Sequence, residues 1–447
     1  MHASEAKRYA IILFAFLVFF AIHFSSLPLE PQAKTVLAIT ALALILWLTE
    51  AIPLHATAIL IALLLVVFGN FAASTVFAQY FDKVVVLVLG GFVLALGLSK
   101  HKLDEFLAYK ILGRVGNSPS MILLGLIAAI AFLSMWMSNS SAAAIGMPIA
   151  LVILTQNKLK PLQSNFGKAM VIGVAYAATI GGIGTIIGST PNVLSQKFLT
   201  EKGIQFGFVE WGIRGFPFMV ALVIVCWLVL RFVFKPEIKT LEMKKHLHPF
   251  TTEQKKVGAI FLLTALLWVT ESIHGIHNSI VALVPIVLLY VFRLLEPRDF
   301  QKAGWSSLIM IGGGIALGMG IESSGLSQLL SAFFSSVFAA QPYIIVLLLM
   351  AVFGILLTSF LSNTAASAVL IPIITVISVS LGLDMTNLVV AGAIGVSMDF
   401  MFPMGTPPSA LAYSSGYIHT RDLLKSGIVL SILGAILLAL FGFFAWG

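Results

Sequence analysis

The chain has 447 residues, of which 59% are hydrophobic and only 10% are charged, and its mean hydropathy is +1.05. A soluble chain carries about 25% charged residues, so this composition excludes a soluble globular protein and places most of the chain in lipid. The single cysteine, Cys226, excludes an intrachain disulfide and a cysteine-based metal site.

A membrane-spanning helix needs about 20 mostly apolar residues. The first apolar stretch follows Lys7 and Arg8 without a small-residue cleavage site before Pro28, so we expect a membrane helix there and no separable signal peptide. In chain order, the eleven predicted crossings occupy residues 8–27, 34–50, 53–70, 83–113, 168–200, 211–234, 254–271, 276–294, 305–330, 388–418 and 424–446.

Two further apolar segments, 120–156 and 342–380, carry a Ser-Asn motif in the middle. Each can form either two short spans or one re-entrant hairpin. With a cytoplasmic N-terminus and two hairpins, nearly all of the 26 lysines and arginines lie on the cytoplasmic side; the exceptions are Lys34, Lys83, Lys197, Lys202 and Arg214. Such a bias is typical of cytoplasmic loops, whereas a crossing in place of one hairpin would remove it.

The hairpin arrangement therefore also explains the net charge of +8, and no nucleic-acid partner is expected. It predicts an integral protein of the lipid bilayer, with the N-terminus in the cytoplasm and the C-terminus outside. The expected membrane is the bacterial inner membrane.

Four short motifs occur twice in the same order, which predicts an internal repeat. The pairs are Trp47-Leu48-Thr49-Glu50 with Trp268-Val269-Thr270-Glu271, Gly90-Gly91 with Gly313-Gly314, Ser138-Asn139-Ser140 with Ser362-Asn363-Thr364, and Gly188-Ser189-Thr190-Pro191-Asn192 with Gly405-Thr406-Pro407-Pro408-Ser409. Counting the crossings places the two copies in opposite orientations.

This repeat divides the chain into an N-terminal helix, two inverted repeats and a charged cytoplasmic linker. The first repeat has a re-entrant hairpin near 120–156 and a broken helix near 168–200, and the second has a hairpin near 342–380 and a broken helix near 388–418. The predicted boundaries are 1–33 for the N-terminal helix, 34–234 for the first repeat, 235–256 for the linker and 254–447 for the second repeat.

Each half thus offers two polar breaks at membrane depth. Pro191, Pro407 and Pro408 remove backbone donors, so a long helix should break there, and Ser189 and Thr406 are suitable N-cap residues. Such breaks supply free carbonyl oxygens for Na⁺ and helix N-termini for an anion. The plainer alternative is that these small polar residues only allow close packing of helices.

At these motifs the chain resembles the divalent-anion/sodium symporter family, the INDY-like di- and tricarboxylate transporters. The resemblance covers essentially the whole chain and rests on two Ser-Asn-Ser/Thr triplets and two Thr-Pro-Pro-like elements, one of each per half. It implies an all-α membrane protein that forms a homodimer, in which an outer scaffold holds a transport domain that moves like an elevator.

The resemblance also implies residue roles. One sodium site would comprise Ser134, Ser138, Asn139 and Gly188, and a second would comprise Thr358, Ser362, Asn363 and Gly405. The substrate carboxylates would face Asn139, Ser140, Ser189, Asn363, Thr364, Thr406 and Pro407.

The chain departs from the family pattern at four places. Ser140 replaces a threonine, Ser189-Thr190-Pro191 replaces Thr-Pro-Pro, and Ser409 replaces an asparagine. Asp399 lies six residues before Gly405, where the family usually has a small neutral residue. An acid at membrane depth can tune the second cation site or accept a proton, or it can be an ordinary hydrogen-bonded residue near a helix end.

The first functional hypothesis is Na⁺-coupled symport of a C4-dicarboxylate such as succinate, malate or fumarate, with Na⁺ co-transported at two or more sites and no organic cofactor. The alternatives within transport are a Na⁺-independent dicarboxylate exchanger, or a symporter for citrate or sulfate. A membrane enzyme is not expected because no nucleophile, base or metal constellation shares one plausible face, and a channel would not need paired asymmetric sites.

Overall fold

The computed structural model describes residues 2–241, 249–329, 338, 341–403 and 405–446, and every regular element in these ranges is a helix. The expectation of an all-α polytopic membrane protein is therefore confirmed in this coarse form. Eight of the described helices are long and apolar enough to cross a membrane, and five apolar helices are shorter. The count of eleven crossings remains a prediction.

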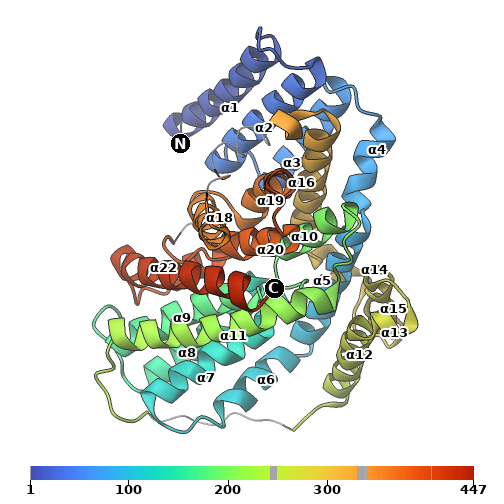
Figure 1. Cartoon of the computed structure of the whole chain (residues 1–447). Helices are drawn as coiled ribbons and strands as arrows, with labels where there is room; N and C mark the ends of the chain where they lie inside the picture. The colour runs from blue at the N-terminus through green and yellow to red at the C-terminus, as the bar shows by residue number, and fades with distance from the viewer. Residues whose placement is uncertain (1, 242–248, 330–337, 339–340, 404, 447) are drawn as a thin grey trace.

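The first half begins with helices that lie at one end of the molecule (Figure 1). They are α1 (His2–His23), α2 (Pro31–Thr49), α3 (Leu54–Val67), α4 (Ala73–Ala78) and the 3-10 turn η1 (Gln79–Phe81). Next come α5 (Lys83–Lys100), α6 (Leu103–Leu112), α7 (Pro119–Ser134), α8 (Asn139–Gln156), α9 (Asn165–Gly181), α10 (Thr190–Glu201) and α11 (Phe208–Val233).

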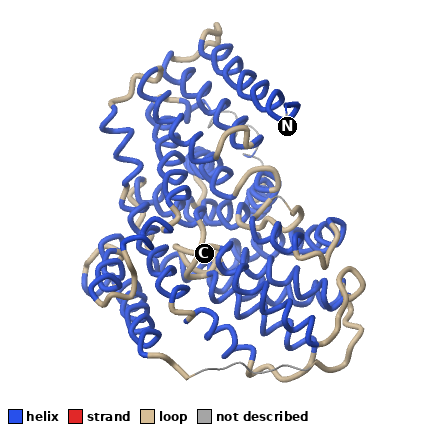
Figure 2. Tube along the Cα trace, turned by 180° about the vertical axis from the view of Figure 1, so that it is seen from behind, coloured by secondary structure: helices blue, strands red, loops and turns tan. Residues whose placement is uncertain are grey.

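The second half comprises α12 (Thr252–Val269), α13 (Glu271–His274), α14 (Asn278–Val281), α15 (Leu283–Val291), η2 (Pro297–Lys302), α16 (Trp305–Ser323), α18 (Tyr343–Thr358), α19 (Asn363–Leu381), α20 (Met385–Val396), α21 (Pro407–Ser414) and α22 (Thr420–Phe444). Figure 2, from behind, shows the same helical construction throughout, with α12 to α15 at the opposite end from α1 to α3.

One predicted span was wrong. The single span 83–113 is two helices, because Lys102 takes a left-handed conformation with φ +54° between α5 and α6. The span 276–294 contains α14 and α15, which follow each other with only Ala282 between them. Thr251 and Gln254 form a reciprocal capping box that starts α12 at Thr252, and the boundary of the linker at residue 256 remains a prediction.

The two tryptophan motifs make the same contacts in both halves. The indole of Trp47 donates to the carbonyl of Leu54 at 3.3 Å, and that of Trp268 donates to the carbonyl of Asn278 at 3.1 Å. Both indoles thereby tie the end of one helix to the start of the next, which fixes the turn between α2 and α3 and the turn between α12 and α14.

The glycine pairs allow two close helix crossings. A Cβ at Gly90 would lie 2.2 Å from the carbonyl oxygen of Ala282, so α5 and α14 approach almost backbone to backbone. A Cβ at Gly313 would lie 2.5 Å from the Cβ of Ala58, so α16 crosses α3 in the same manner. Each glycine-rich helix therefore packs against the helix pair of the other half of the chain.

The predicted helix breaks are present in both halves. The hairpin helices α7 and α8 are joined at residues 135–138, and α18 and α19 are joined at 359–362. The first broken helix consists of α9 and α10, which are separated by residues 182–189, and the second consists of α20 and α21, which are separated by residues 397–406. Irregular backbone at membrane depth is tolerated where it is buried in protein or lines a cavity, and these four segments meet at one place.

Candidate functional site

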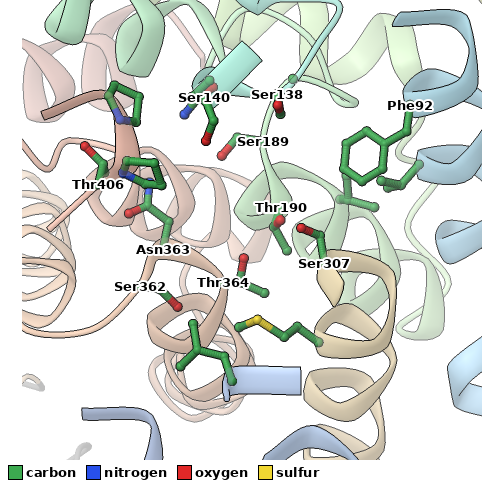
Figure 3. A pocket seen from close by; sticks show the side chains of 18 of the residues that line it. Phe92, Ser138, Ser140, Ser189, Thr190, Ser307, Ser362, Asn363, Thr364 and Thr406 are labelled. Atoms are coloured by element: carbon green, nitrogen blue, oxygen red, sulfur yellow. The ribbon is translucent and has the colours of Figure 1, made fainter. Parts of the chain in front are cut away.

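A cavity of about 230 Å³ lies where the four breaks meet. Figure 3 shows polar side chains from both halves around this cavity. Ser138, Ser140 and Ser189 are gathered on one side, and Asn363, Thr364 and Thr406 lie on other sides of the cavity. The lining residues from the breaks are Ser138, Asn139, Ser140, Ile187, Gly188, Ser189, Thr190, Val193, Ser362, Asn363, Thr364, Gly405, Thr406, Pro407 and Pro408.

The structure brings all seven residues predicted to face substrate to this cavity. It also brings six of the residues predicted to hold sodium there: Ser138, Asn139, Gly188, Ser362, Asn363 and Gly405. The other two, Ser134 and Thr358, lie behind the lining and are fully buried. Their hydroxyls contact the side chains of the lining asparagines, so the predicted set forms one connected group.

At the first hairpin tip, three oxygen atoms crowd together. The hydroxyl of Ser134 lies 3.0 Å from Asn139 Oδ1 and 2.5 Å from the carbonyl oxygen of Ala178 on α9. A hydroxyl has one proton and can donate to only one of the two acceptors. The remaining lone pairs make this an oxygen-rich cluster of the kind that can coordinate a small cation.

The second hairpin tip has the same design. The hydroxyl of Thr358 donates to Asn363 Oδ1 at 2.8 Å. Ser362 caps α19 by accepting from the amide of Ala365 at 3.3 Å, just as Ser138 caps α8 by accepting from the amide of Ser141 at 3.2 Å. The sequence folds this way locally because serine at the N-cap satisfies an otherwise free helix donor.

In the first half, an asparagine holds the broken helix in shape. Asn192 Nδ2 donates to the carbonyls of Gly182 and Thr185, both at 2.8 Å. The hydroxyl of Thr185 donates in turn to the carbonyl of Met135 in the hairpin tip. A Cβ at Gly182 would lie 2.6 Å from Asn139 Oδ1, so only glycine lets the break approach this amide.

In the second half, the broken helix is held by hydroxyl groups. Thr406, as predicted, is the N-cap of α21: it accepts from the amide of Ser409 at 3.4 Å and donates to the hydroxyl of Ser409 at 3.1 Å. Asp399 lies against Gly405, the residue before Thr406, because a Cβ at Gly405 would lie 1.9 Å from Asp399 Oδ2. Ser189 is the N-cap of α10 as predicted, but by backbone geometry alone.

Among the residues that the structure describes, none that lines the cavity is charged. The first residues of α8, α10, α19 and α21, which are Asn139, Thr190, Asn363 and Pro407, all line it. Four helix N-termini therefore converge on one neutral cavity, and each brings the positive end of a helix dipole. The first turns of α8 and α19 also carry backbone N–H groups, whereas α21 opens with Pro407 and Pro408, which have none. An anion fits such a cavity without a lysine or arginine.

Sequence reasoning missed the wall opposite the breaks. Leu54 of α3, Val88 and Phe92 of α5, and Ser307 and Met310 of α16 complete the lining. In the sequence, the glycine pairs of α5 and α16 predicted that these helices make close contacts. They did not indicate which face of each helix would line the cavity.

Comparison with known proteins identifies the family. The chain matches the sodium:sulfate symporter transmembrane region over residues 3–447. This chain belongs to the divalent-anion/sodium symporter family. It is 32% identical to the sodium-dependent dicarboxylate transporter SdcS of Staphylococcus saprophyticus, with 93% of this chain and 86% of that protein covered.

Two further similarities extend the comparison. The chain is 31% identical to an uncharacterized transporter of Haemophilus influenzae, over 100% of this chain and 99% of that protein. Its fold is similar to the crystal structure of the YdaH transporter of Alcanivorax borkumensis, with a TM-score of 0.58 at 13% identity, covering 82% of this chain and 86% of that one. The family and these relatives are transporters, so the protein is a membrane transporter and not an enzyme.

Proposed function

We propose that this protein couples Na⁺ to the uptake of a C4-dicarboxylate such as succinate, malate or fumarate. The observation that carries the proposal is the convergence of both Ser-Asn tips and both broken helices on one uncharged cavity. Two relatives of known substrate class, the SdcS proteins of S. saprophyticus and S. aureus, are named sodium-dependent dicarboxylate transporters.

The cations are assigned to the two hairpin tips. Na⁺ prefers oxygen ligands, and each tip offers a buried hydroxyl beside an asparagine oxygen. The first tip adds the carbonyl of Ala178 and lies against Gly182 of the facing break. The proposed sets remain Ser134, Ser138, Asn139 and Gly188 for the first site, and Thr358, Ser362, Asn363 and Gly405 for the second.

The anion is assigned to the cavity between the tips. Each carboxylate would accept from hydroxyls and amides at the helix N-termini, with Asn139, Ser140 and Ser189 on one side and Asn363, Thr364 and Thr406 on the other. Pro407 would face the substrate without donating a hydrogen bond. The volume of about 230 Å³ lies below the range of about 300–1,000 Å³ usual for drug-sized ligands, which favours a small dianion.

Transport is proposed to follow an elevator motion in an inverted-repeat homodimer. The moving part would hold the two hairpins and the broken helices, and the scaffold would include α3, α5, α14 and α16. The backbone-close crossings at Gly90 and Gly313 support a rigid scaffold, because each crossing joins elements from opposite halves of the chain.

A second cavity of about 260 Å³ shares Phe92, Ser138, Ser140 and Ser307 with the first and also reaches Lys302. The predicted topology places Lys302 on the cytoplasmic side. We therefore assign this second cavity as the path between the site and the cytoplasm.

The test is uptake of labelled succinate into proteoliposomes with an inward Na⁺ gradient, compared with choline at equal ionic strength. Accumulation above the equilibrium level should require Na⁺. Uptake that is unchanged without Na⁺ but depends on succinate inside the vesicles would replace symport with Na⁺-independent exchange. Competition by citrate or sulfate stronger than that by malate would reassign the substrate.

A further inference from the structure

The break between α20 and α21 holds a buried carboxylate with no visible partner. Asp399 is only 1% exposed, and neither of its carboxylate oxygens has a hydrogen-bond partner among the described residues. None of the ion pairs in the described part of the chain includes it. An unpaired carboxylate inside a membrane protein is costly, so it must be neutralised by a proton or paired with a cation.

The equivalent position in the first break carries no acid. Gly182 lies six residues before Gly188, as Asp399 lies six residues before Gly405. In the first break, the carbonyl of Gly182 accepts the amide of Asn192. In the second, Ser409 replaces that asparagine and its hydroxyl contacts Thr406. The second break has therefore lost an amide donor and gained an acid.

The position of the acid indicates what compensates it. Asp399 Oδ2 lies against Gly405, which lines the central cavity and belongs to the proposed second sodium site. Among the described residues, no charged side chain lines that cavity. A cation that transport brings to this break would therefore supply a counter-charge that those residues do not supply.

We propose that Asp399 supplies a carboxylate oxygen to the Na⁺ bound at the second site, which has no counterpart in the first site. This inference rests on the proposed Na⁺ coupling and adds a ligand to it. A full negative charge attracts a desolvated cation more strongly than neutral oxygens do. The second site is thereby the tighter of the two and fills first as the Na⁺ concentration rises.

The experiment is thermal unfolding of the purified full-length protein as NaCl replaces choline chloride at constant ionic strength. A ligand that binds only the folded state raises Tm as its concentration passes Kd. D399N and D399S, two neutral variants, should each raise the NaCl concentration for half-maximal stabilisation at least about tenfold, the change that follows from a loss of about 1.4 kcal/mol. Either variant that folds decides the question.

The matched control is D104N. Asp104 is also 1% exposed, but it accepts hydrogen bonds from Ser99 and from the amide of Glu105, far along the chain from either Ser-Asn tip. Its neutral variant should keep the NaCl titration midpoint of the wild type even if Tm falls. D399E retains a carboxylate, so its NaCl concentration for half-maximal stabilisation should lie between those of the wild type and D399N.

The outcomes separate the two proposals. If wild-type Tm does not respond to Na⁺ beyond the response to choline, the proposed Na⁺ coupling fails. If the wild type responds and D399N and D399S show the same midpoint, Na⁺ coupling stands and the role of Asp399 is wrong, as expected for a protonated acid. An equal fall of Tm in both salts with an unchanged midpoint would make Asp399 a structural residue only.

Discussion

The two broken helices perform the same task with different chemistry. In the first, the amide of Asn192 bridges two carbonyls and leaves glycine at position 182, next to Asn139. In the second, hydroxyls of Thr406 and Ser409 cap the helix, and Asp399 lies buried beside Gly405. The hairpin tips opposite these breaks make nearly the same contacts, so the geometry of the tips is repeated while that of the breaks is not.

The largest effect should come from the shared part of the two halves. Asn139→Ala and Asn363→Ala each remove a group proposed to contact both a cation and the substrate. Each should lower Na⁺-driven succinate uptake at least about 100-fold, because an oxygen ligand of the cation and a hydrogen bond to a carboxylate are lost, and a polar contact with a charged group is worth about 1.5–3 kcal/mol.

Uptake into proteoliposomes measures this prediction. Asn165→Ala is the control, since Asn165 is an exposed residue in the first turn of α9 that lies outside the cavity lining. A strong loss in only one of the two asparagine variants would break the proposed equivalence of the tips.

The next effect should distinguish the two breaks. Asn192→Ala leaves the buried carbonyls of Gly182 and Thr185 without this donor, whereas Ser409→Ala removes a single hydroxyl. We expect about 2 kcal/mol or more lost from the free energy of unfolding for Asn192→Ala and about 1 kcal/mol for Ser409→Ala. Denaturant or thermal unfolding compares the two variants. Equal losses in the free energy of unfolding would contradict the proposed difference in how the two breaks are held.

A smaller effect should follow from filling the space at the first tip. Gly182→Ala places a methyl group 2.6 Å from Asn139 Oδ1, so the asparagine must move away from its contact with Ser134. Uptake should fall about tenfold through a higher half-saturating Na⁺ concentration, a change of about 1.4 kcal/mol. Gly212→Ala has nothing within 4 Å of the added methyl and should behave as wild type; an unchanged Na⁺ dependence in Gly182→Ala would separate this tip from cation binding.

Much of this comparison was predictable from the sequence. Prolines 191, 407 and 408 in apolar runs predict broken helices, and the repeated Ser-Asn pairs predict matching N-caps, because these residues act through local backbone geometry. The cavity wall was not predictable in this way. Phe92 and Ser307 reach the cavity because α5 and α16 pack closely against helices of the other half at Gly90 and Gly313, which the local pattern does not encode.

Two structural details were not predicted. The break at Lys102 falls in the polar run Ser99-Lys100-His101-Lys102 and is followed by Asp104 and Glu105 in the first turn of α6, so a local signal was present and the predicted span 83–113 overlooked it. The bridging role of Asn192 depends on the shape of the loop 182–189, which folds its two carbonyls toward one amide. Asp399 was identifiable as unusual, but its lack of a protein partner is a property of tertiary packing.

The smallest effect should occur at the proposed cytoplasmic path. Lys302→Gln removes an exposed positive charge from the lining of the second cavity. This cavity also includes Ser138 of the first tip, whereas Lys302 does not line the central cavity. Exposed charges contribute about 1 kcal/mol or less, so succinate efflux should show a KM raised about twofold, with the difference lost at high salt. A larger effect on uptake from the opposite side would reverse the proposed orientation.

The most direct test of the account is the linkage between the two ligands in the purified protein. If both halves build one site for Na⁺ and a dicarboxylate, each ligand must increase the affinity for the other by the same factor. We predict that succinate raises Tm strongly in NaCl and hardly at all in choline chloride. An equal rise of Tm in both salts would contradict the claim that the cations and the anion share this cavity.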